Sequence, residues 1–548
     1  MTVARLEKIH TRWVVPQEDQ SLLVAPAPTQ VSSLLAANRE LLWSCPDHQG
    51  YDFQGHTFGE LLKICREDLL QKAMTYTGSY REVSVPMPSD GFSVPVILGG
   101  HQPDIFHPGV WAKNFALHRW SMENGGIGLQ ILIDADVPKS FGLSVPGGSV
   151  AHPQRMHIDL DHRKDRIPYE AWEVQDITEF ESFGDRVTQF IAPLIGDPFI
   201  RRYWPRVLKR AKVVRKVGLC LAQARHQFEA EWGAQTLELP QSEVCKSHSF
   251  HWFTAHLLAN LPRLHEIYNS VLSEYRHQNR LRNKAHPVPD LAAAENWLEA
   301  PFWIWTDRDP HRKPLLCHYQ GDKLLLTGGK EIEFSLQATP EGDLHTAVEQ
   351  LAEAEATGIH IRSRALLTTM YARLFCGDLF VHGIGGGNYD RLTDKMIQRF
   401  FDFQPPEYMV VSGTLRLPLP RNGVTVEDIR HCDARLRDLV FNPDRALQQT
   451  SDSVAASDYQ TWIAEKKQWI ETPLTPENAL VRHQAIERCN AALQPFVRGF
   501  SDTLRTQRKE LIAKLHADKV LAAREYAFCL FPEDLLGEFL LDSVAQSL

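Results

Sequence analysis

Two segments of this chain share one pattern, in which a short apolar run ends in glycines and a helix follows. In the first segment, Val94 to Leu98 is apolar, Gly99-Gly100 comes next, and a helix is predicted from Pro108 to Met122. Another apolar run, Leu129 to Ile133, then ends in Asp134-Ala-Asp136. Strand, helix and strand in this order predict an α/β fold with a parallel sheet, because parallel neighbours need a crossover connection.

The second segment has a predicted strand at Asp378 to His382, then Gly383-Ile-Gly-Gly-Gly387, a helix from Tyr389 to Phe401 and a strand from Tyr408 to Val411. Three consecutive glycines permit positive φ angles and leave main-chain N–H groups uncovered, which forms a concavity for anions. Two such glycine segments after strands predict one shared crevice at the carboxyl edge of one sheet.

The first glycine segment places polar side chains at the floor of that crevice. His101 is able to donate a hydrogen bond to a phosphate or to transfer a proton, and Gln102 lies beside it. The alternative is a tight turn in which His101 is a core residue. Asp134 and Asp136 lie two apart and face one way, so they suit a hydroxylated or ammonium-bearing substrate or Mg²⁺. Capping a turn before Pro138 is an equally good interpretation.

These patterns give two sets of candidates. The candidate catalytic residues are His101, Gln102, Asp134 and Asp136. The candidate cofactor-binding residues are Gly99, Gly100, His382, Gly383, Gly385, Gly386, Gly387 and Asn388. Asn388 and Asp390 are also suited to cap the following helix. The segments match neither the dinucleotide nor the P-loop fingerprint, so they do not specify the ligand.

Two further clusters favour structural interpretations. His157, Asp159 and Asp161 alternate along a predicted strand, which is typical of a solvated face more than of a metal site, and no metal is predicted. The range 201–216 contains eight Lys or Arg residues and no acid, but apolar residues recur within it at helical spacing. A solvated basic helix face is therefore favoured over a nucleic-acid contact.

The composition sets the class of protein. Apolar residues make up 43% of the 548 residues and the net charge is -9, which predicts a folded chain with no general attraction to nucleic acid. Nine scattered cysteines predict neither a disulfide framework nor a thiolate zinc site. Met1 to Arg12 has no signal-peptide pattern and no stretch is apolar enough to span a membrane, so a cytoplasmic location without a membrane partner is expected.

The chain resembles the bacillithiol synthase family, the cysteine-adding enzymes. The resemblance rests on Gly100-His-Gln-Pro103 after an early strand, with Lys113 in the helix behind it. Pro301-Phe-Trp-Ile-Trp305 followed by Arg312-Lys-Pro-Leu-Leu316, and Arg362-Ser-Arg364, support it, and the order holds from about residue 90 to the carboxyl end. Two stretches differ from the family, Asp134 to Pro138 and Gly383 to Gly387, which allows a different acceptor.

The resemblance implies a Rossmann-like core with inserted segments and a long, coiled-coil-like carboxyl-terminal region that forms a homodimer. It also implies a ligase that joins cysteine, or a similar amine or thiol, to a carboxylate-bearing sugar-type acceptor, with ATP or ADP as the cofactor. Other hypotheses are a nucleotide- or sugar-phosphate-dependent transferase and a non-catalytic homologue that binds a small molecule.

The expected organisation has five parts. They are a helical lead-in (1–90), the first half of the core (91–200), a helical insertion (201–295), the second half of the core (296–420) and a helical carboxyl-terminal region (421–548). Two long helices are predicted in the insertion, at Tyr203 to Trp232 and Phe250 to Lys284, and short strands are predicted at Phe302 to Trp305, Pro314 to His318 and Lys323 to Leu326. In the carboxyl-terminal region, apolar residues that include Leu493, Val497 and Leu504 recur at helical spacing and predict a packing stripe.

Overall fold

A computed structural model of the chain describes residues 12–85, 92–163, 165–283, 285–329, 332–448 and 456–543. Of the range Met1 to Arg12, which was read as lacking a signal-peptide pattern, residues 1–11 lie outside the described residues. The chain divides into two compact units. The first is Met1–Val145, Met156–Arg416 and Arg524–Leu548, and the second is Pro146–Arg155 and Leu417–Ala523. No described helix is both long and apolar enough to cross a membrane.

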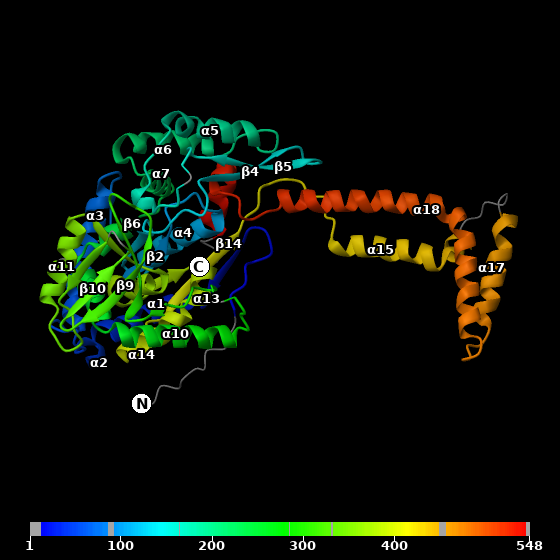
Figure 1. Cartoon of the computed structure of the whole chain (residues 1–548). Helices are drawn as coiled ribbons and strands as arrows, with labels where there is room; N and C mark the ends of the chain where they lie inside the picture. Colours follow the sequence, from blue (N-terminus) through cyan, green and yellow to red (C-terminus); the bar gives the residue numbers. More distant parts are fainter. Residues whose placement is uncertain are drawn as a thin grey trace. The chain divides into compact units, whose positions relative to one another are not determined.

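Five parallel strands form the centre of the first unit, and a sixth strand is antiparallel at one edge (Figure 1). In spatial order they are β1 (Ser21–Ala25), β14 (Tyr408–Thr414), β13 (Leu379–His382), β2 (Val96–His101), β3 (Ile127–Leu132) and β6 (Leu237–Pro240). The predicted α/β class with a parallel sheet is confirmed, and β1 makes the sheet mixed. All residues of β3 and β14 are buried, as expected for strands covered on both faces.

The order of the strands reverses between β2 and β13. From β2 the chain passes through α4 (Pro108–Glu123) to β3 on one side. It later returns through β13, α13 (Ile384–Tyr389), α14 (Arg391–Phe401) and β14 on the other side. The carboxyl ends of β2 and β13 are therefore adjacent at the point of reversal, where open α/β sheets leave a crevice.

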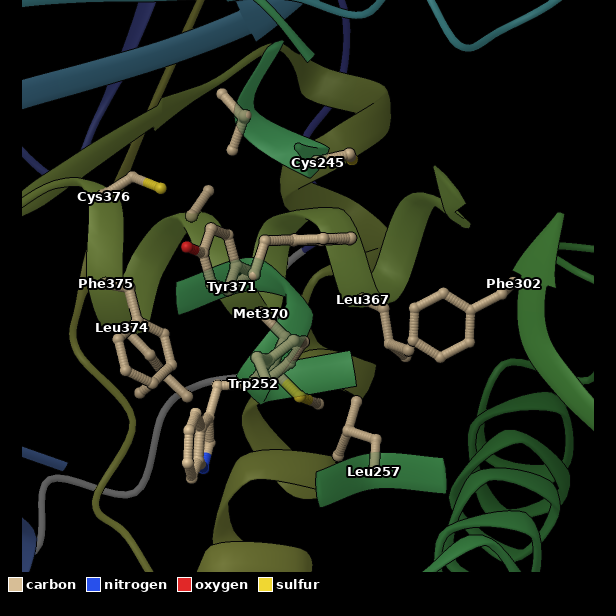
Figure 2. Packing of buried hydrophobic residues seen from close by; sticks show 14 of the residues in the cluster. Cys245, Trp252, Leu257, Phe302, Leu367, Met370, Tyr371, Leu374, Phe375 and Cys376 are labelled. Carbon is tan, nitrogen blue, oxygen red and sulfur yellow. The ribbon is translucent and has the colours of Figure 1, made fainter. Parts of the chain in front are cut away.

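Helices cover both faces of this sheet, and successive residues of β2 face opposite cores. Ile97 packs with Trp120 of α4 and Leu35 of α1 on one face. Leu98 joins a larger core on the other face, part of which Figure 2 shows around Trp252. This alternation is the strand period of two that the apolar run implies. The helices that contribute to these cores include α1 (Val31–Trp43), α3 (Phe58–Gly78), α4, α9 (His248–Ala259) and α12 (Ala365–Tyr371).

The strands expected in the second half of the core do not all join the parallel sheet. The predicted strands near Trp303, Leu315 and Leu325 belong to a separate antiparallel sheet. Short turns connect them, so each strand pairs with its neighbour in the chain. The order of this sheet is β11 (Glu333–Leu336), β10 (Lys323–Thr327), β9 (Lys313–Gln320), β8 (Trp297–Thr306) and β12 (Ile359–Ser363), with β7 (Ala293–Ala294) paired to β8.

The range 201–295, expected as a helical insertion, also contains β6 of the parallel sheet. The predicted helix Tyr203–Trp232 is two helices, because Arg215 has a φ of 64° that ends the first one. The end of the second predicted helix at Lys284 lies outside the described residues. The helices before and after β6 include α5 (Ile177–Ile191), α6 (Ile200–Val214), α7 (Val217–Glu231), α8 (Gln241–Cys245), α9 and α10 (Leu261–Gln278).

The part of the second unit from Leu417 to Ala523 is helical, as predicted for the carboxyl-terminal region, whereas the end of that predicted region, from Arg524, belongs to the first unit. Its helices include α15 (Val426–Phe441), α16 (Pro443–Gln448), α17 (Ala456–Glu471) and α18 (Ala479–Leu521). The predicted stripe of α18 is buried inside this unit at Leu493, Val497 and Leu504, where it packs with residues of α15 and α17 such as Leu439 and Tyr459.

One buried carboxylate connects four elements at the amino ends of the two central strands. Asp378, just before β13, accepts hydrogen bonds from both terminal nitrogens of Arg66 in α3, at 3.0 and 2.9 Å. It also accepts from Arg39 and Trp43 of α1 and from the Val96 main-chain nitrogen of β2, at 2.8 to 3.0 Å. Burial alone would raise the pKa of Asp378, but the ion pairs with Arg66 and Arg39 hold that pKa below its ordinary value.

Replacing Asp378 with Asn should lower the free energy of unfolding by about 3–5 kcal/mol, because it leaves the fully buried Arg66 without its counter-charge. The contribution of the charge should be complete above about pH 4 and should be lost as the pH falls through the lowered pKa of the folded state. Urea unfolding at pH 7 measures the change. Glu123→Gln, which removes an exposed ion pair with Arg119, is the control and should cost under about 1 kcal/mol. Equal costs would contradict the prediction.

Candidate functional site

A cavity of about 650 Å³ lies at the carboxyl ends of β2 and β13, within the first unit. This volume suits a small-molecule ligand. Of the predicted site residues, those that line it are Gly100, His101, Gln102, Asp136, His382, Gly383, Gly385 and Gly386. The structure therefore brings both glycine segments to one cavity, as the sequence predicts.

His101 and Gln102 extend from the end of β2 into this cavity. The Nδ1 atom of His101 lies 3.1 Å from the Gln102 carbonyl oxygen, which only accepts hydrogen bonds. Burial, and secondarily the charge of Lys113, lower the pKa of His101 to about 3. His101 is therefore neutral at physiological pH, with its hydrogen on Nδ1 and with Nε2 as the acceptor.

Asp136 is held between two side chains on the cavity wall. Its Oδ2 atom accepts a hydrogen bond from Gln102 Nε2 at 2.8 Å, and its Oδ1 atom accepts one from Arg312 at 2.9 Å. Asp134 points elsewhere. It is 1% exposed and accepts hydrogen bonds from the nitrogen and hydroxyl of Ser242, and burial raises its pKa to about 7. The two aspartates thus do not form a shared magnesium site, and no three metal-ligating side chains cluster among the described residues.

The prediction of a glycine loop at 383–387 is wrong. Residues 384–389 form the short helix α13, and Gly385, Gly386 and Gly387 have no positive φ angle. Consequently they do not form the predicted anion concavity. The reason for glycine here is space, because a Cβ atom at Gly387 would lie 2.4 Å from Val410, and one at Gly386 would lie 2.8 Å from His382.

The remaining glycines of the candidate set divide by position. A Cβ atom at Gly383 or Gly385 would meet nothing within 4 Å, since both face open space at the cavity. Gly99 is internal to the sheet, where a Cβ atom would lie 2.6 Å from Gln130. Asn388 exchanges hydrogen bonds with the main chain of Trp13, at 2.9 and 3.1 Å, and does not line the cavity.

His382 has a buried carboxylate partner. Its Nε2 atom lies 2.9 Å from Oδ2 of Asp390, which also accepts from Arg373 at 2.6 Å. The other Asp390 oxygen accepts from the hydroxyl of Thr369 at 2.6 Å. Burial lowers the pKa of His382, and the Asp390 carboxylate opposes this shift. The expected capping role of Asp390 is wrong, because its side chain makes no capping hydrogen bond to α14.

The lining contains more cations than carboxylates. Five Lys or Arg side chains line the cavity, namely Lys113, Lys139, Arg312, Arg364 and Arg524, against the two carboxylates Asp136 and Glu525. Arg312 and Arg364 both lie over the ring of Trp303, with guanidinium carbons 4.8 and 4.0 Å from its centroid. The ring thus holds two guanidinium groups on one wall. Each also pairs with a carboxylate, Arg312 with Asp136 at 2.9 Å and Arg364 with Glu299 at 2.7 Å.

Sequence reasoning gave these arginines no role in the site. Arg312, Arg364 and Arg524 come from three distant segments that only the fold brings together. A usable signal was the position of Arg364, a basic residue directly between a strand and a helix. Arg312 begins one of the motifs that support the resemblance, and Arg524 carries no local signal.

The two clusters with structural interpretations lie away from the cavity. His157 and Asp159 are nearly half exposed on β5 (Pro153–Asp159), which pairs with β4 (Gly142–Gly148), and their side chains lie 3.1 Å apart. Asp161 is buried and accepts hydrogen bonds from the main chain at Arg163 and Gln175. The basic range 201–216 contains most of α6, and none of its residues lines the cavity.

No family model matches this chain, and no curated protein matches it. The resemblance to the bacillithiol synthase family therefore rests on the motifs quoted above. The geometry of the cavity supplies the physical argument for function.

The two kinds of glycine in α13 should respond differently to substitution. Gly387→Ala should lower the free energy of unfolding by about 1–3 kcal/mol, because the added methyl group overlaps Val410. Gly385→Ala should leave stability unchanged or raise it by up to about 1 kcal/mol, because alanine favours a helix and meets no neighbour there. Urea unfolding of both variants tests this, and equal destabilisation would contradict the assignment of Gly385 to the cavity wall.

Proposed function

We propose that this chain is a ligase of the bacillithiol synthase type, which joins cysteine, or a similar amine or thiol, to a carboxylate-bearing sugar-type acceptor. The observation that carries this proposal is the excess of cations in the cavity lining. Even without Lys113, four cationic side chains line the cavity, against the two carboxylates of the lining and Glu299, which pairs with Arg364. Such a lining suits an acceptor carboxylate and the phosphates of a nucleotide.

The strand order supports the Rossmann-like core that the resemblance implies. Numbered along the chain, the five parallel strands β2, β3, β6, β13 and β14 lie in the order 3-2-1-4-5. This is the order of the first five strands in a doubly wound dinucleotide-binding sheet, and the cavity lies at its switch point.

ATP or ADP is the proposed cofactor, and the residues fit it in part. Arg312 and Arg364 would hold phosphate oxygens, whereas α13 offers no glycine nest for them. When bound, ATP would supply the phosphoryl or nucleotidyl group that activates a carboxylate. Neutral His101 would present its Nε2 atom as a hydrogen-bond acceptor to an N–H or O–H group of the substrate.

Ligand binding tests this function directly. Calorimetric titration with ATP, ADP, cysteine and amino sugars should show binding of both a nucleotide and cysteine. Phosphate ligands without cysteine would favour a phosphate-dependent transferase instead, and binding without turnover would favour a non-catalytic homologue. Arg312→Gln should weaken nucleotide binding about 10- to 100-fold, because one charge-assisted hydrogen bond is worth about 1.5–3 kcal/mol. Arg119→Gln, on the exposed part of α4, is the matched control and should bind normally.

We also propose a homodimer formed through the carboxyl-terminal helices, as the resemblance implies. Phe496, Phe500 and Ile512 of α18 are 36–40% exposed, so the second unit leaves apolar side chains uncovered on this helix. Leu504 is already buried within the unit and is therefore unsuitable for testing the dimer.

Light scattering at micromolar concentration should give twice the chain mass of 62.4 kDa. The double variant Phe500→Glu and Ile512→Glu should reduce this to the mass of one chain while the thermal midpoint stays within a few degrees, because exposed positions cost little stability. A wild-type mass of one chain would rule the dimer out.

A further inference from the structure

Lys113 is a buried lysine on the wall of the cavity. It lies in the second turn of α4 and is 2% exposed. Its Nζ atom donates a hydrogen bond to the carbonyl oxygen of Gly100, at 2.7 Å, where β2 enters the cavity. A lysine this buried is costly as a cation unless a carboxylate compensates its charge.

No such carboxylate pairs with Lys113 within the described parts of the chain. The carboxylate on α7, Glu229, accepts hydrogen bonds from Trp111 and Asn114 and pairs with Arg225. The other charged or titratable groups near Lys113 are Arg225 and the imidazoles of His101 and His382.

These surroundings favour the neutral amine. Burial, followed by the positive charge of Arg225, lowers the pKa of Lys113 to about 7. An ordinary lysine has a pKa near 10.4, so it remains protonated at physiological pH. A neutral amine that faces a ligand cavity is suited to accept a proton, because a general base works best when its pKa is near the operating pH.

We propose that Lys113 accepts the proton that the attacking amine must lose before it forms the new bond. This inference rests on the proposed function for the identity of the substrate. In the step, an N–H bond of the substrate ammonium breaks and an N–H bond forms on Nζ. The substrate nitrogen keeps the electron pair for attack, and the lysine becomes an ammonium ion, so no other reactant is needed.

The alternative role for Lys113 is that of a permanent cation that binds an anionic ligand. Lys139 lines the same cavity but is exposed, so it serves as the matched control within one molecule. Competitive labelling of the whole protein with acetic anhydride, followed by mass spectrometry, reports the neutral fraction of each amine as the pH changes. We expect a labelling midpoint near pH 7 for Lys113, well below the pKa near 10.4 of an ordinary lysine. A midpoint for Lys113 above about pH 9 would overturn the proposal.

Two variants then separate proton acceptance from anion binding. Lys113→Arg keeps the positive charge but does not release its proton, and Lys113→Met removes the charge. If Lys113 is the proton acceptor, both variants should lower kcat about 100-fold or more, and both should lose the rise of kcat near pH 7. If Lys113 only binds an anion, Lys113→Arg should retain activity, which would overturn the proposal. Thermal midpoints of both variants establish that they fold.

Failure of this proposal is distinguishable from failure of the proposed function. If the wild-type protein does not couple cysteine to any acceptor, the proposed ligase activity is wrong. The labelling midpoint of Lys113 is measured without substrate, so it still decides whether this amine is neutral at physiological pH. A midpoint near 7 would then support Lys113 as the proton acceptor for whichever substrate the cavity binds.

Discussion

The buried carboxylate of Asp378 is the interaction on which the arrangement of the site depends. It joins β13 to β2 through the Val96 nitrogen and joins both strands to helices through Arg66 and Arg39. These contacts lie at the amino ends of the strands, whereas the cavity lies at their carboxyl ends. The contacts that stabilise β2 and β13 thus lie at the amino ends of these strands, and the residues that face the ligand lie at their carboxyl ends.

Much of the fold was predictable from the sequence because its central strands are strongly apolar and its helices have clear ends. The run that became β2 and the helix from Pro108 match the structure to within a few residues. The strand β6 was missed, because it is four residues long and lies among long helices. The strands around Trp303 were recognised, but their sheet was not, because pairing between strands is decided by tertiary packing.

The site was predictable in location more than in chemistry. His101 and Gly385 were placed in one crevice because glycines followed two strands, and the cavity contains both. The prediction of an anion concavity was wrong. Glycine occurs at 386 and 387 because a Cβ atom there would overlap His382 and Val410, and neither residue has a positive φ angle. Asp134 was expected beside Asp136 in the site because the two residues lie two apart. Its carboxylate instead accepts hydrogen bonds from Ser242, and the local sequence does not indicate this contact.

The glycines around the cavity also bear on how its specificity could change during evolution. Gly383 and Gly385 face open space, so side chains of many sizes would be tolerated there and would reshape the volume available to a ligand. Gly387 is pressed against Val410, and a Cβ atom at Gly109 of α4 would overlap the Gly413 carbonyl of β14. Substitutions at 383 and 385 can therefore accompany a change of acceptor, whereas Gly387 and Gly109 must be kept. Relatives with different substrates should differ first at 383 and 385.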